Sequence, residues 1–532
     1  MKVIIRSVYE DFVPSEYFET RIPDTKIPPE FADEILRHDH GSPCFVSAGT
    51  GAGKTTLAAK LICRMDEMGL HSLYLANRKA VTSQQKREIA KIRGDSSVEH
   101  YTEIGLEQQE DFGNLRIVTY QRAVSMLSNT ENCKWLSKVR LVILDEAHYF
   151  VEDALFNPYC QMTLENVIGS CSDANRVYLS ATPWSVLNVL GEAERDQYSH
   201  MSNFRIPLRE PRAFYYYEFA RDYSGIDLNF IPTLDAICPV IQAHPNEKFL
   251  IFTASKEEGK RLAEKIGEQA EYLDSSMKTS ETWKRLISES RFDRQVLVTT
   301  SVAYNGVNII DADLRHIVID AMTRTQLIQM LGRKRLKKGE TVKAWVVDMP
   351  REKITRRYGQ IAGDLKWCSR YTSPGTDASS KLAAELWKEE NPALRKLFYI
   401  GNNGKLYKND YAEFELRRRA YFLESLLRSK REHPFQDAVR SWLSLEPETE
   451  RDYAKELMEF YLRHKGLVLN ETDQDELRKM VLEIAAAKGI QTRSDRRDSA
   501  GVQVLNSLLE KLGTAFTILP SWRFRCLQED TQ

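Results

Sequence analysis

Short runs of β-branched and other apolar residues recur over the first 350 residues of the chain, and helix-like segments lie between most of them. Runs of this kind are typical of strands that are buried on both faces of a parallel sheet. They lie at 44–46, 72–76, 117–119, 139–144, 176–179, 249–252, 295–298, 316–319 and 342–347. The alternation predicts an α/β fold built from two tandem doubly wound parallel sheets.

Beyond residue 350 the pattern changes to that of amphipathic helices. These helices are expected at about 411–430, 450–465, 472–488 and 498–513. The Asn403-Gly404 pair, inside the segment 398–407, predicts a β-hairpin. Residues 351–532 are therefore expected to form a mostly α-helical C-terminal domain.

The last segment alternates around the Pro520-Ser521 turn and allows two interpretations. Two helices followed by a β wing would form a winged-helix-like unit, with Trp522, Arg523 and Arg525 facing nucleic acid. Alternatively, a final hairpin closes the helical core. The sequence leaves both interpretations open.

Breaks in the pattern also divide the rest of the chain. Residues 1–40 are rich in proline and acids, with a strand-like start and a helix-like 30–37, and are expected to form an appendage on the first lobe. Prolines and an aromatic run at 205–217 mark a boundary. The first lobe is therefore expected at 41–205 and the second at 206–350.

Composition narrows the class of protein. With 532 residues, 42% hydrophobic and 28% charged, the chain can build several cores. No apolar run approaches membrane-spanning length, and residues 1–6 are too short and too quickly followed by acids for a signal peptide. A cytoplasmic location without membrane contact is expected. The eight cysteines include no Cys-x-x-Cys pair, so neither a zinc site nor a disulfide framework is indicated.

The formal net charge of −1 argues against wholesale attraction to a polyanion but leaves room for local patches. Basic runs at 417–419, 428–431 and 493–497 are candidates for nucleic-acid contact. The alternative is that these runs lie on solvated faces of amphipathic helices.

The strongest chemical signal is the small-residue segment 48–56, which lies between a predicted strand and a predicted helix. Backbone N–H groups of such a turn can surround phosphate oxygens at the positive end of the helix. Lys54 would reach the β- and γ-phosphates of ATP, and the Thr55 hydroxyl would complete a Mg²⁺ coordination shell. Ala48 stands where the strict pattern has glycine, so this is a variant P-loop. The predicted nucleotide-binding residues are Gly49, Thr50, Gly51, Ala52, Gly53, Lys54, Thr55 and Thr56.

A second chemical signal is the pair of acids Asp145 and Glu146, which directly follows the apolar run at 139–144. This run predicts a central strand that is buried on both faces. Ligands bind at this end of the strands in such sheets. Asp145 is placed to hold Mg²⁺ through water, and Glu146 can orient and deprotonate the attacking water.

The string Asp145-Glu146-Ala147-His148 also names the DEAD/DEAH-box class, and the chain resembles superfamily 2 helicases. The further motifs follow in the family's order between about residues 40 and 350. Motifs Ia, Ib and III correspond to 75–78, 118–121 and 180–182, and motifs IV, V and VI correspond to 251–255, 299–308 and 329–335. The resemblance implies that both lobes are RecA-like.

The resemblance also implies roles for individual residues. Ser180 and Thr182 of motif III would couple hydrolysis to movement, and Gln329 and His148 would join the catalytic group. Gly306 and Asn308 of motif V would lie at the nucleotide. The residues implied to touch nucleic-acid phosphates, without reading sequence, are Arg78, Thr119, Ser255 and Thr300.

Arg333 and Arg335 of motif VI are predicted to reach across the cleft and stabilise charge on the γ-phosphate. Many family members place the second arginine three residues after the first, where this chain has Leu336. A shorter ending also occurs among relatives, so Arg333 carries more weight and Arg335 stays open. The alternative is a solvated basic face shared with neighbouring lysines. No glutamine precedes Gln84, so the contact to the base must differ from that of DEAD-box RNA helicases.

Together these features predict a nucleic-acid-dependent ATPase that uses ATP and Mg²⁺ to move on or unwind DNA or RNA. DNA is favoured because the 145–150 string and the compact helical tail look like DEAD/DEAH-box proteins of bacterial genomes and mobile elements. The alternative is an ATP-gated clamp or adaptor that recruits a protein partner through its C-terminal domain. A third interpretation is a P-loop NTPase unrelated to nucleic acid. Glu258 and Lys260 have the spacing of a nuclease motif but lack an acidic partner on the preceding strand.

Overall fold

The larger of the chain's two units, Pro14–Leu445, contains both sheets, and the smaller combines Met1–Val13 with Glu446–Gln532. The computed structural model describes residues 3–7, 17–77, 79–191, 193–194, 213–274, 276–277, 280–300, 309–336, 339–388, 396–400, 404–443, 457, 460, 468–469, 471–487, 502–511 and 516–520.

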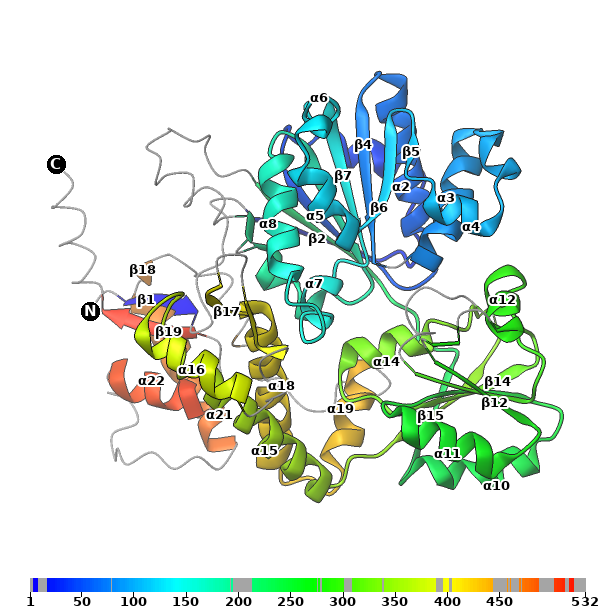
Figure 1. Ribbon diagram of the computed structural model, residues 1–532. Helices are drawn as coiled ribbons and strands as arrows, with labels where there is room; N and C mark the ends of the chain where they lie inside the picture. Colours follow the sequence, from blue (N-terminus) through cyan, green and yellow to red (C-terminus); the bar gives the residue numbers. More distant parts are fainter. Residues whose placement is uncertain are drawn as a thin grey trace, which may run out of the picture. The chain divides into compact units, whose positions relative to one another are not determined.

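The first sheet of the larger unit has eight strands among the described residues, and each neighbouring pair except β5 and β6 is parallel. In spatial order they are β2 (Tyr17–Ile22), β9 (Phe214–Phe219), β3 (Pro43–Ser47), β8 (Asn175–Ser180), β7 (Val139–Asp145), β4 (His71–Ala76), β6 (Leu115–Thr119) and β5 (Asp111–Phe112). Helices α2 (Lys54–Glu67) and α3 (Lys79–Arg93) lie on one side of it, and α5 (Tyr120–Ser128) and α8 (Cys160–Ser170) on the other (Figure 1). This double cover explains why β3 and β8 are buried along their whole length.

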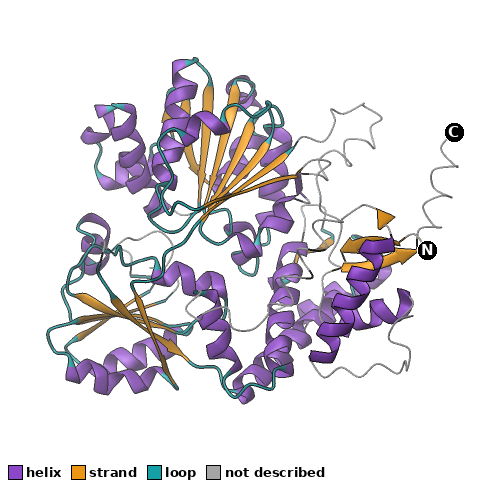
Figure 2. Ribbon diagram, turned by 180° about the vertical axis from the view of Figure 1, so that it is seen from behind, coloured by secondary structure: helices purple, strands orange, loops and turns teal. Residues whose placement is uncertain are grey.

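The second sheet contains six described strands, all parallel to their neighbours. In spatial order they are β10 (Ile226–Ile231), β15 (Val342–Val347), β14 (Leu314–Ile319), β11 (Lys248–Phe252), β13 (Val296–Thr299) and β12 (Ala270–Leu273). Helices α10 (Cys238–Ala243) and α11 (Lys256–Ile266) cover one face, and α12 (Glu281–Ser288) and α14 (Arg324–Leu331) lie on the other side. Figure 2 shows both sheets from behind, each flanked by helices. The predicted pair of doubly wound parallel sheets is confirmed.

The aromatic run near residue 214 is predicted to mark a boundary between the lobes, but in the structure it forms a strand of the first sheet. β9 lies between β2 and β3, so the first sheet extends past residue 205. Tyr216 and Tyr217 are buried, and Phe31 of α1 (Phe31–Ile35) packs edge-on against Tyr217 at 4.9 Å between ring centroids. Aromatic residues fit a buried pleated surface well, and here they form a strand rather than a linker.

A helical region follows the second sheet within the larger unit. It contains α15 (Arg351–Cys368), α16 (Asp377–Lys388), α18 (Asp410–Arg428) and α19 (Pro434–Trp442). Strands β16 (Phe398–Ile400) and β17 (Leu406–Lys408) form an antiparallel hairpin at the predicted place. The helical C-terminal character is thus confirmed. None of the helices in the described parts of the chain is long and apolar enough to cross a bilayer.

The smaller unit joins the two ends of the sequence in one sheet. Strand β1 (Val3–Ser7) lies between β18 (Val468–Leu469) and β19 (Phe516–Pro520), antiparallel to both. Helices α21 (Glu471–Ala487) and α22 (Val502–Lys511) belong to the same unit. The strand-like start of the chain therefore pairs with C-terminal strands and not with the first lobe, because alternation identifies a strand but not its partner. Trp522, Arg523 and Arg525 lie outside the described residues.

Candidate active site

The small-residue segment folds as a loop between β3 and α2. Gly51 and Gly53 have φ values of 75° and 103°, in the left-handed region that glycine adopts without strain. Lys54 opens α2, so the N–H groups of its first turn face the loop and create partial positive charge there. The loop contains Gly49, Thr50, Gly51, Ala52 and Gly53, and the first helical turn contains Lys54, Thr55 and Thr56.

Lys54 is buried in this loop, with 9% of its surface exposed. Its Nζ donates to the carbonyl oxygens of Ala48 at 2.9 Å and Gly49 at 3.0 Å. Burial lowers the pKa of the ammonium to about 8, although Glu146 and Asp145 oppose this change. A buried cation whose hydrogen bonds go to carbonyl oxygens is well suited to an anionic ligand.

Asp145 ends β7 beside the loop and is 4% exposed. Its Oδ2 accepts a hydrogen bond from Tyr74 Oη at 2.7 Å and another from the Gln85 amide, while Oδ1 accepts from Glu146 N at 3.0 Å. Burial and the neighbouring Glu146 raise the pKa of Asp145. The sequence reasoning missed Gln85. A polar residue at a helix position that faces the protein interior could have indicated it. Gln85 lies four residues before Ile89, on the buried face of α3.

A chain of hydrogen bonds and one His148–Glu146 ion-pair contact connects the two lobes through Glu146. Glu146 Oε2 lies 3.4 Å from His148 Nδ1 and accepts from Gln329 Nε2 at 3.4 Å. His148 Nδ1 is 3.1 Å from Ser180 Oγ, and Arg333 donates to the Gln329 carbonyl at 2.8 Å and to Gln329 Oε1 at 2.7 Å. The structure thus brings together five residues that the sequence analysis placed in three separate motifs.

The electrostatics of this group favour a charged carboxylate. Burial alone would raise the pKa of Glu146, but the charges of His148, Lys54, Arg333 and Arg335 outweigh it and lower the pKa. Thr182 donates its backbone N–H to Ser180 Oγ at 3.0 Å, which fixes the hydroxyl that faces His148.

Motif VI reaches the glycine-rich loop from the second lobe. A Cβ built on Gly51 would lie 3.0 Å from Arg335 Nη1, and a Cβ on Gly332 would lie 2.5 Å from the Thr50 side chain. Arg333 is only 3% exposed, and burial lowers its pKa to about 10. The absence of a side chain at both glycines therefore permits the close approach of the two lobes.

The charges around the loop are suited to a polyphosphate. Lys54, Arg333 and Arg335 are cationic, with Arg221 as a further cation near Lys54, whereas Asp145, Glu146 and Glu88 are the anionic groups that act on them. Arg335 is largely buried, like Lys54 and Arg333, and burial lowers its pKa. This cation excess fits the phosphates of a nucleotide, and the carboxylate and hydroxyl oxygens of Asp145 and Thr55 fit a hard cation such as Mg²⁺.

Two family models match the chain. The model described as DEAD/DEAH box helicase covers residues 25–189, and the model described as helicase conserved C-terminal domain covers residues 232–335. The chain belongs to the DEAD/DEAH-box helicases. It is therefore an ATP-dependent helicase of superfamily 2. No curated protein sequence matches this helicase.

Solved structures similar to this helicase include Saccharomyces cerevisiae Dbp5 bound to RNA and ADP BeF3, at 17% identity and TM-score 0.44, covering 60% of this chain and 82% of that chain. Mss116p bound to ssRNA and AMP-PNP has 13% identity and TM-score 0.47, covering 81% of this chain and 98% of that chain. Mycobacterium smegmatis Lhr bound to ssDNA and AMP-PNP has 15% identity and TM-score 0.44, covering 76% of this chain and 60% of that chain.

The residues expected to touch nucleic acid in this helicase differ in their surroundings. Thr119 caps α5, its Oγ1 accepting from Arg122 N at 3.2 Å, and the first turn of α5, which is described in full, carries no acidic residue. Ser255 caps α11, but its hydroxyl donates to Glu257 at 2.9 Å, and Glu257 and Glu258 occupy that first turn. A phosphate would be repelled more at Ser255 than at Thr119.

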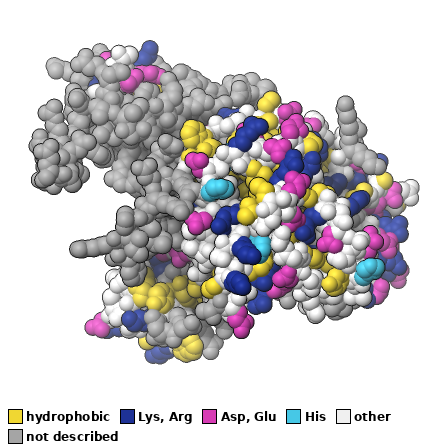
Figure 3. Space-filling view, turned by 90° about the horizontal axis from the view of Figure 1, so that it is seen from above, with side chains coloured by type: hydrophobic (Ala, Val, Ile, Leu, Met, Phe, Trp, Pro, Cys, Tyr) yellow, Lys and Arg dark blue, Asp and Glu magenta, His cyan; other side chains and the backbone are white. Residues whose placement is uncertain are grey.

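The remaining residues predicted to lie at the nucleotide or the nucleic acid are Thr300, Arg78, Gly306 and Asn308. Thr300 follows β13 and is 7% exposed. Arg78, Gly306 and Asn308 lie outside the described residues. On the face drawn in Figure 3, basic and acidic side chains are interspersed, in agreement with the net charge of −1.

In the basic run at 417–419, Arg418 and Arg419 form neither a nucleic-acid patch nor a solvated face, whereas Arg417 is exposed. Arg418 donates to Glu415 at 2.8 Å and to Glu152 of the first lobe at 3.2 Å, and Arg419 donates to Glu415 at 2.5 Å. Glu152 and Glu415 are buried, whereas the side chain of Arg417 is 57% exposed. Arg418 and Arg419 therefore dock α18 on the first lobe of the helicase.

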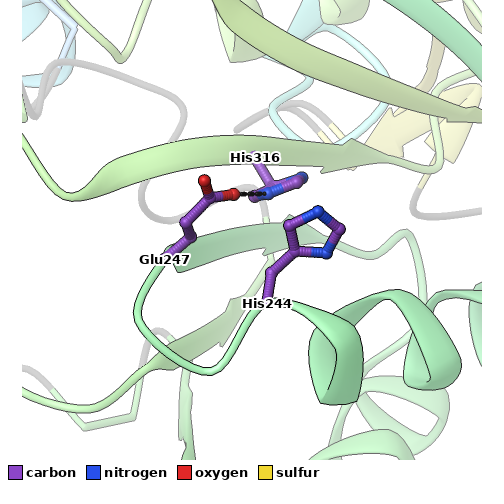
Figure 4. A group of neighbouring side chains, drawn as sticks. All are labelled: His244, Glu247 and His316. Atoms are coloured by element: carbon purple, nitrogen blue, oxygen red, sulfur yellow. Dashed lines mark hydrogen bonds and ion pairs between the residues drawn. The ribbon is translucent and has the colours of Figure 1, made fainter.

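A second group of potential metal ligands lies in the second lobe of the helicase and contains His244, Glu247 and His316 (Figure 4). His316 Nδ1 accepts the indole N–H of Trp345 at 3.1 Å, which places the ring proton on Nε2, where it is donated to Glu247 at 2.5 Å. His316 Nε2 therefore has no lone pair for a metal. Zinc sites use at least three protein ligands, and this hydrogen-bond pattern leaves two.

Proposed function

We propose that this helicase translocates on nucleic acid and separates its strands, hydrolysing ATP between the two lobes. The observation that carries the proposal is the chain of polar contacts from Ser180 through His148 and Glu146 to Gln329 and Arg333. A site that is completed only by contact between lobes links each hydrolysis cycle to opening and closing of the cleft. Such a cycle is the physical basis of movement along a strand.

Most of the nucleotide binding is assigned to the first lobe. The backbone amides of 49–53 and Lys54 hold the phosphates, and Thr56 continues the helical turn beside them. Thr55 and Asp145 would hold Mg²⁺, which when bound contributes positive charge to the γ-phosphate. Gly306 and Asn308 of motif V complete the proposed nucleotide contacts.

The chemical step is assigned to Glu146 and to motif VI. Glu146 Oε2 is occupied by Gln329 and His148, so Oε1 is the oxygen that orients the attacking water and accepts its proton. The lowered pKa of Glu146 keeps this base ionised at neutral pH. Arg333 stabilises the charge that develops on the γ-phosphate. Arg335, which faces the glycine-rich loop, is proposed as a second contact to the phosphates.

The track is proposed to be DNA rather than RNA, and its binding to be independent of sequence. The preference for DNA is based on the resemblance to helicases of bacterial genomes and mobile elements. Thr119, Thr300, Arg78 and Ser255 are the proposed phosphate contacts, and Thr119 has more favourable surroundings than Ser255. Contacts of this kind position the strand without reading its bases.

A clamp or adaptor that does not unwind is the second candidate. It is favoured by the smaller unit, whose described residues include none of the proposed catalytic or nucleotide-binding residues and which could recruit a protein partner. Strand displacement separates the two functions, because a clamp hydrolyses ATP without separating strands.

The test measures the ATPase rate of the full chain with single- and double-stranded DNA and RNA, and then displacement of a labelled strand from the preferred duplex. We expect stimulation by DNA and displacement that needs ATP, with Glu146→Gln as the inactive control. ATPase activity without displacement would support the clamp. ATPase activity that ignores every polynucleotide would overturn both functions.

A further inference from the structure

Trp184 stands at the border of the two lobes, two residues after Thr182 of motif III. It lies in the short turn Pro183–Ser185 of the first lobe and is half-buried. The guanidinium carbon of Arg324, the first residue of α14, lies 3.5 Å from the centroid of its ring. A cation this close to an indole face is strongly attracted to it, and more so where water is excluded.

Arg221 connects the same indole to the phosphate-binding loop. Its guanidinium carbon lies 4.9 Å from the Trp184 ring centroid. Its Nη2 donates to Ser47 Oγ at 2.5 Å and to the Ala181 carbonyl at 3.3 Å. Ser47 ends the strand that leads into the glycine-rich loop, and a Cβ built on Gly49 would lie 3.9 Å from Arg221 Cγ. Trp184 is thus tied to both the loop and motif III.

Helix α14 contacts the first lobe at three points along its length. Arg324 stacks on Trp184 at the first turn, Gln329 binds Glu146 in the second turn, and Gly332 touches Thr50 just after the last residue. A helix is a rigid rod that rises 1.5 Å per residue. Fixing its first turn therefore limits where Gln329, and then Arg333, can lie.

We propose that Trp184 and Arg324 form a positioning pair for ATP hydrolysis. Their stack docks the first turn of α14 on the first lobe and sets Gln329 and Arg333 opposite Glu146. The inference rests on the roles proposed above for Glu146 and Arg333. It adds a contact through which a change in motif III can move Arg333, the arginine proposed to face the γ-phosphate.

Neither residue of the pair has another partner that explains its position equally well. Arg324 also donates to the Trp442 carbonyl, but at 3.4 Å, and its buried Nε has no hydrogen-bond partner among the described residues. The first turn of α14 is already capped by Thr323 and Gln326, which exchange hydrogen bonds in a capping box. Removing the Arg324 side chain should therefore leave the helix folded and change only its docking.

The test is a double-mutant cycle in the full chain, with Trp184→Leu, Arg324→Gln and the double variant. Steady-state ATPase is measured at saturating polynucleotide to give kcat and KM for ATP. We expect each single variant to lose about tenfold in kcat, because a desolvated stack is lost, and to keep KM within about twofold. The double variant should lose no more than the more severe single variant, because both remove the same contact. Trp184→Tyr should recover most of kcat, because it retains an aromatic face.

A matched control lies within the first lobe alone, where Arg116 stacks on Trp135 at 4.3 Å. Trp135→Leu should lower the melting temperature and leave kcat unchanged. If Trp184→Leu does not fold, Arg324→Gln and Arg324→Lys carry the test, because they change only the cation. Additive losses, or a kcat within twofold of the parent in Arg324→Gln, would overturn the pair. A parent chain without polynucleotide-stimulated ATPase would instead overturn the proposed function.

Discussion

Gln329 Nε2 donates to Glu146 Oε2 over 3.4 Å, so a side chain of the second lobe orients the proposed base of the first. Gln329 is itself fixed by Arg333, which binds both its carbonyl and its amide oxygen. Separation of the lobes would release the base and withdraw the arginine in one movement. Hydrolysis in the open form should therefore be slow, and this expectation leads to the first two predictions.

Glu146→Gln and Lys54→Ala are both expected to abolish steady-state ATP hydrolysis, for different reasons. The amide introduced by Glu146→Gln cannot accept a proton from water, whereas loss of Lys54 removes a charge that binds the phosphates. Binding of a fluorescent ATP analogue should therefore survive in Glu146→Gln and weaken in Lys54→Ala. Turnover near the parental rate in Glu146→Gln would show that another residue is the base.

Arg333→Ala is expected to lower kcat by ~10³ or more with little change in nucleotide affinity, as for other arginines that face the γ-phosphate. Arg335→Ala should mainly raise KM for ATP, by about tenfold, because its guanidinium faces the loop that holds the phosphates. Arg315→Ala, with a side chain 46% exposed in the same lobe, is the control. Unchanged kcat and KM in Arg335→Ala would leave Arg333 as the one arginine of motif VI that acts on ATP.

The pH dependence of kcat/KM for ATP should reflect Asp145. Burial, with the nearby Glu146, raises the pKa of Asp145 to about 6, so the proton is bound below this pH and the carboxylate is present above it. Only the carboxylate can hold Mg²⁺. kcat/KM, which reports on the free enzyme, should therefore fall as the pH drops through about 6. Tyr74→Phe removes a hydrogen bond that stabilises the carboxylate, so this fall should move to higher pH. An unchanged profile in Tyr74→Phe would argue against Asp145 as the titrating group.

Thr119→Val is expected to weaken polynucleotide binding by about fivefold, the loss of roughly one hydrogen bond to a phosphate. Thr119→Ser retains the hydroxyl and should bind like the parent. Ser255→Ala should change affinity by less than about twofold, because Glu257 and Glu258 oppose a phosphate at the start of α11. Fluorescence anisotropy at fixed salt gives the three affinities. A larger loss in Ser255→Ala than in Thr119→Val would reverse this order.

Arg419→Met is expected to lower the free energy of unfolding by about 3–5 kcal/mol, because it leaves Glu152 and Glu415 buried with one cation fewer. Arg417→Met removes a pair between an exposed arginine and Glu413, which keeps Lys408 as its second cation, and should cost less than about 1 kcal/mol. Urea unfolding of both variants measures the difference. Equal stability of the two would mean that the buried pairs contribute no more than a surface pair.

The features predicted well from the sequence are those whose residues lie close together along the chain. The glycine-rich loop and the strand that ends at Asp145 each carry their chemistry within a short stretch, and both sheets follow from short apolar runs. The predictions were wrong where the role of a residue depends on a partner that is distant in the sequence. Arg418 looked like part of a basic patch because its partner Glu152 is 266 residues away.

Two further differences have the same origin. The aromatic run at 214–219 was interpreted as a boundary because the prolines before it are local signals, whereas its neighbours β2 and β3 are far away in the sequence. Gln85 was missed because a helical position acquires a role only when α3 is packed beside Asp145.

The pairing of β1 with β19 has a consequence for how the protein is made. Ile5 lies opposite Ile518, about 500 residues later in the sequence. During synthesis β1 leaves the ribosome before the two lobes and remains without this neighbour until both lobes have been translated, and closing such a long loop is slow. The smaller unit is thus completed after the ATPase core has had time to fold. Shortening the chain at either end would remove a strand from the same sheet.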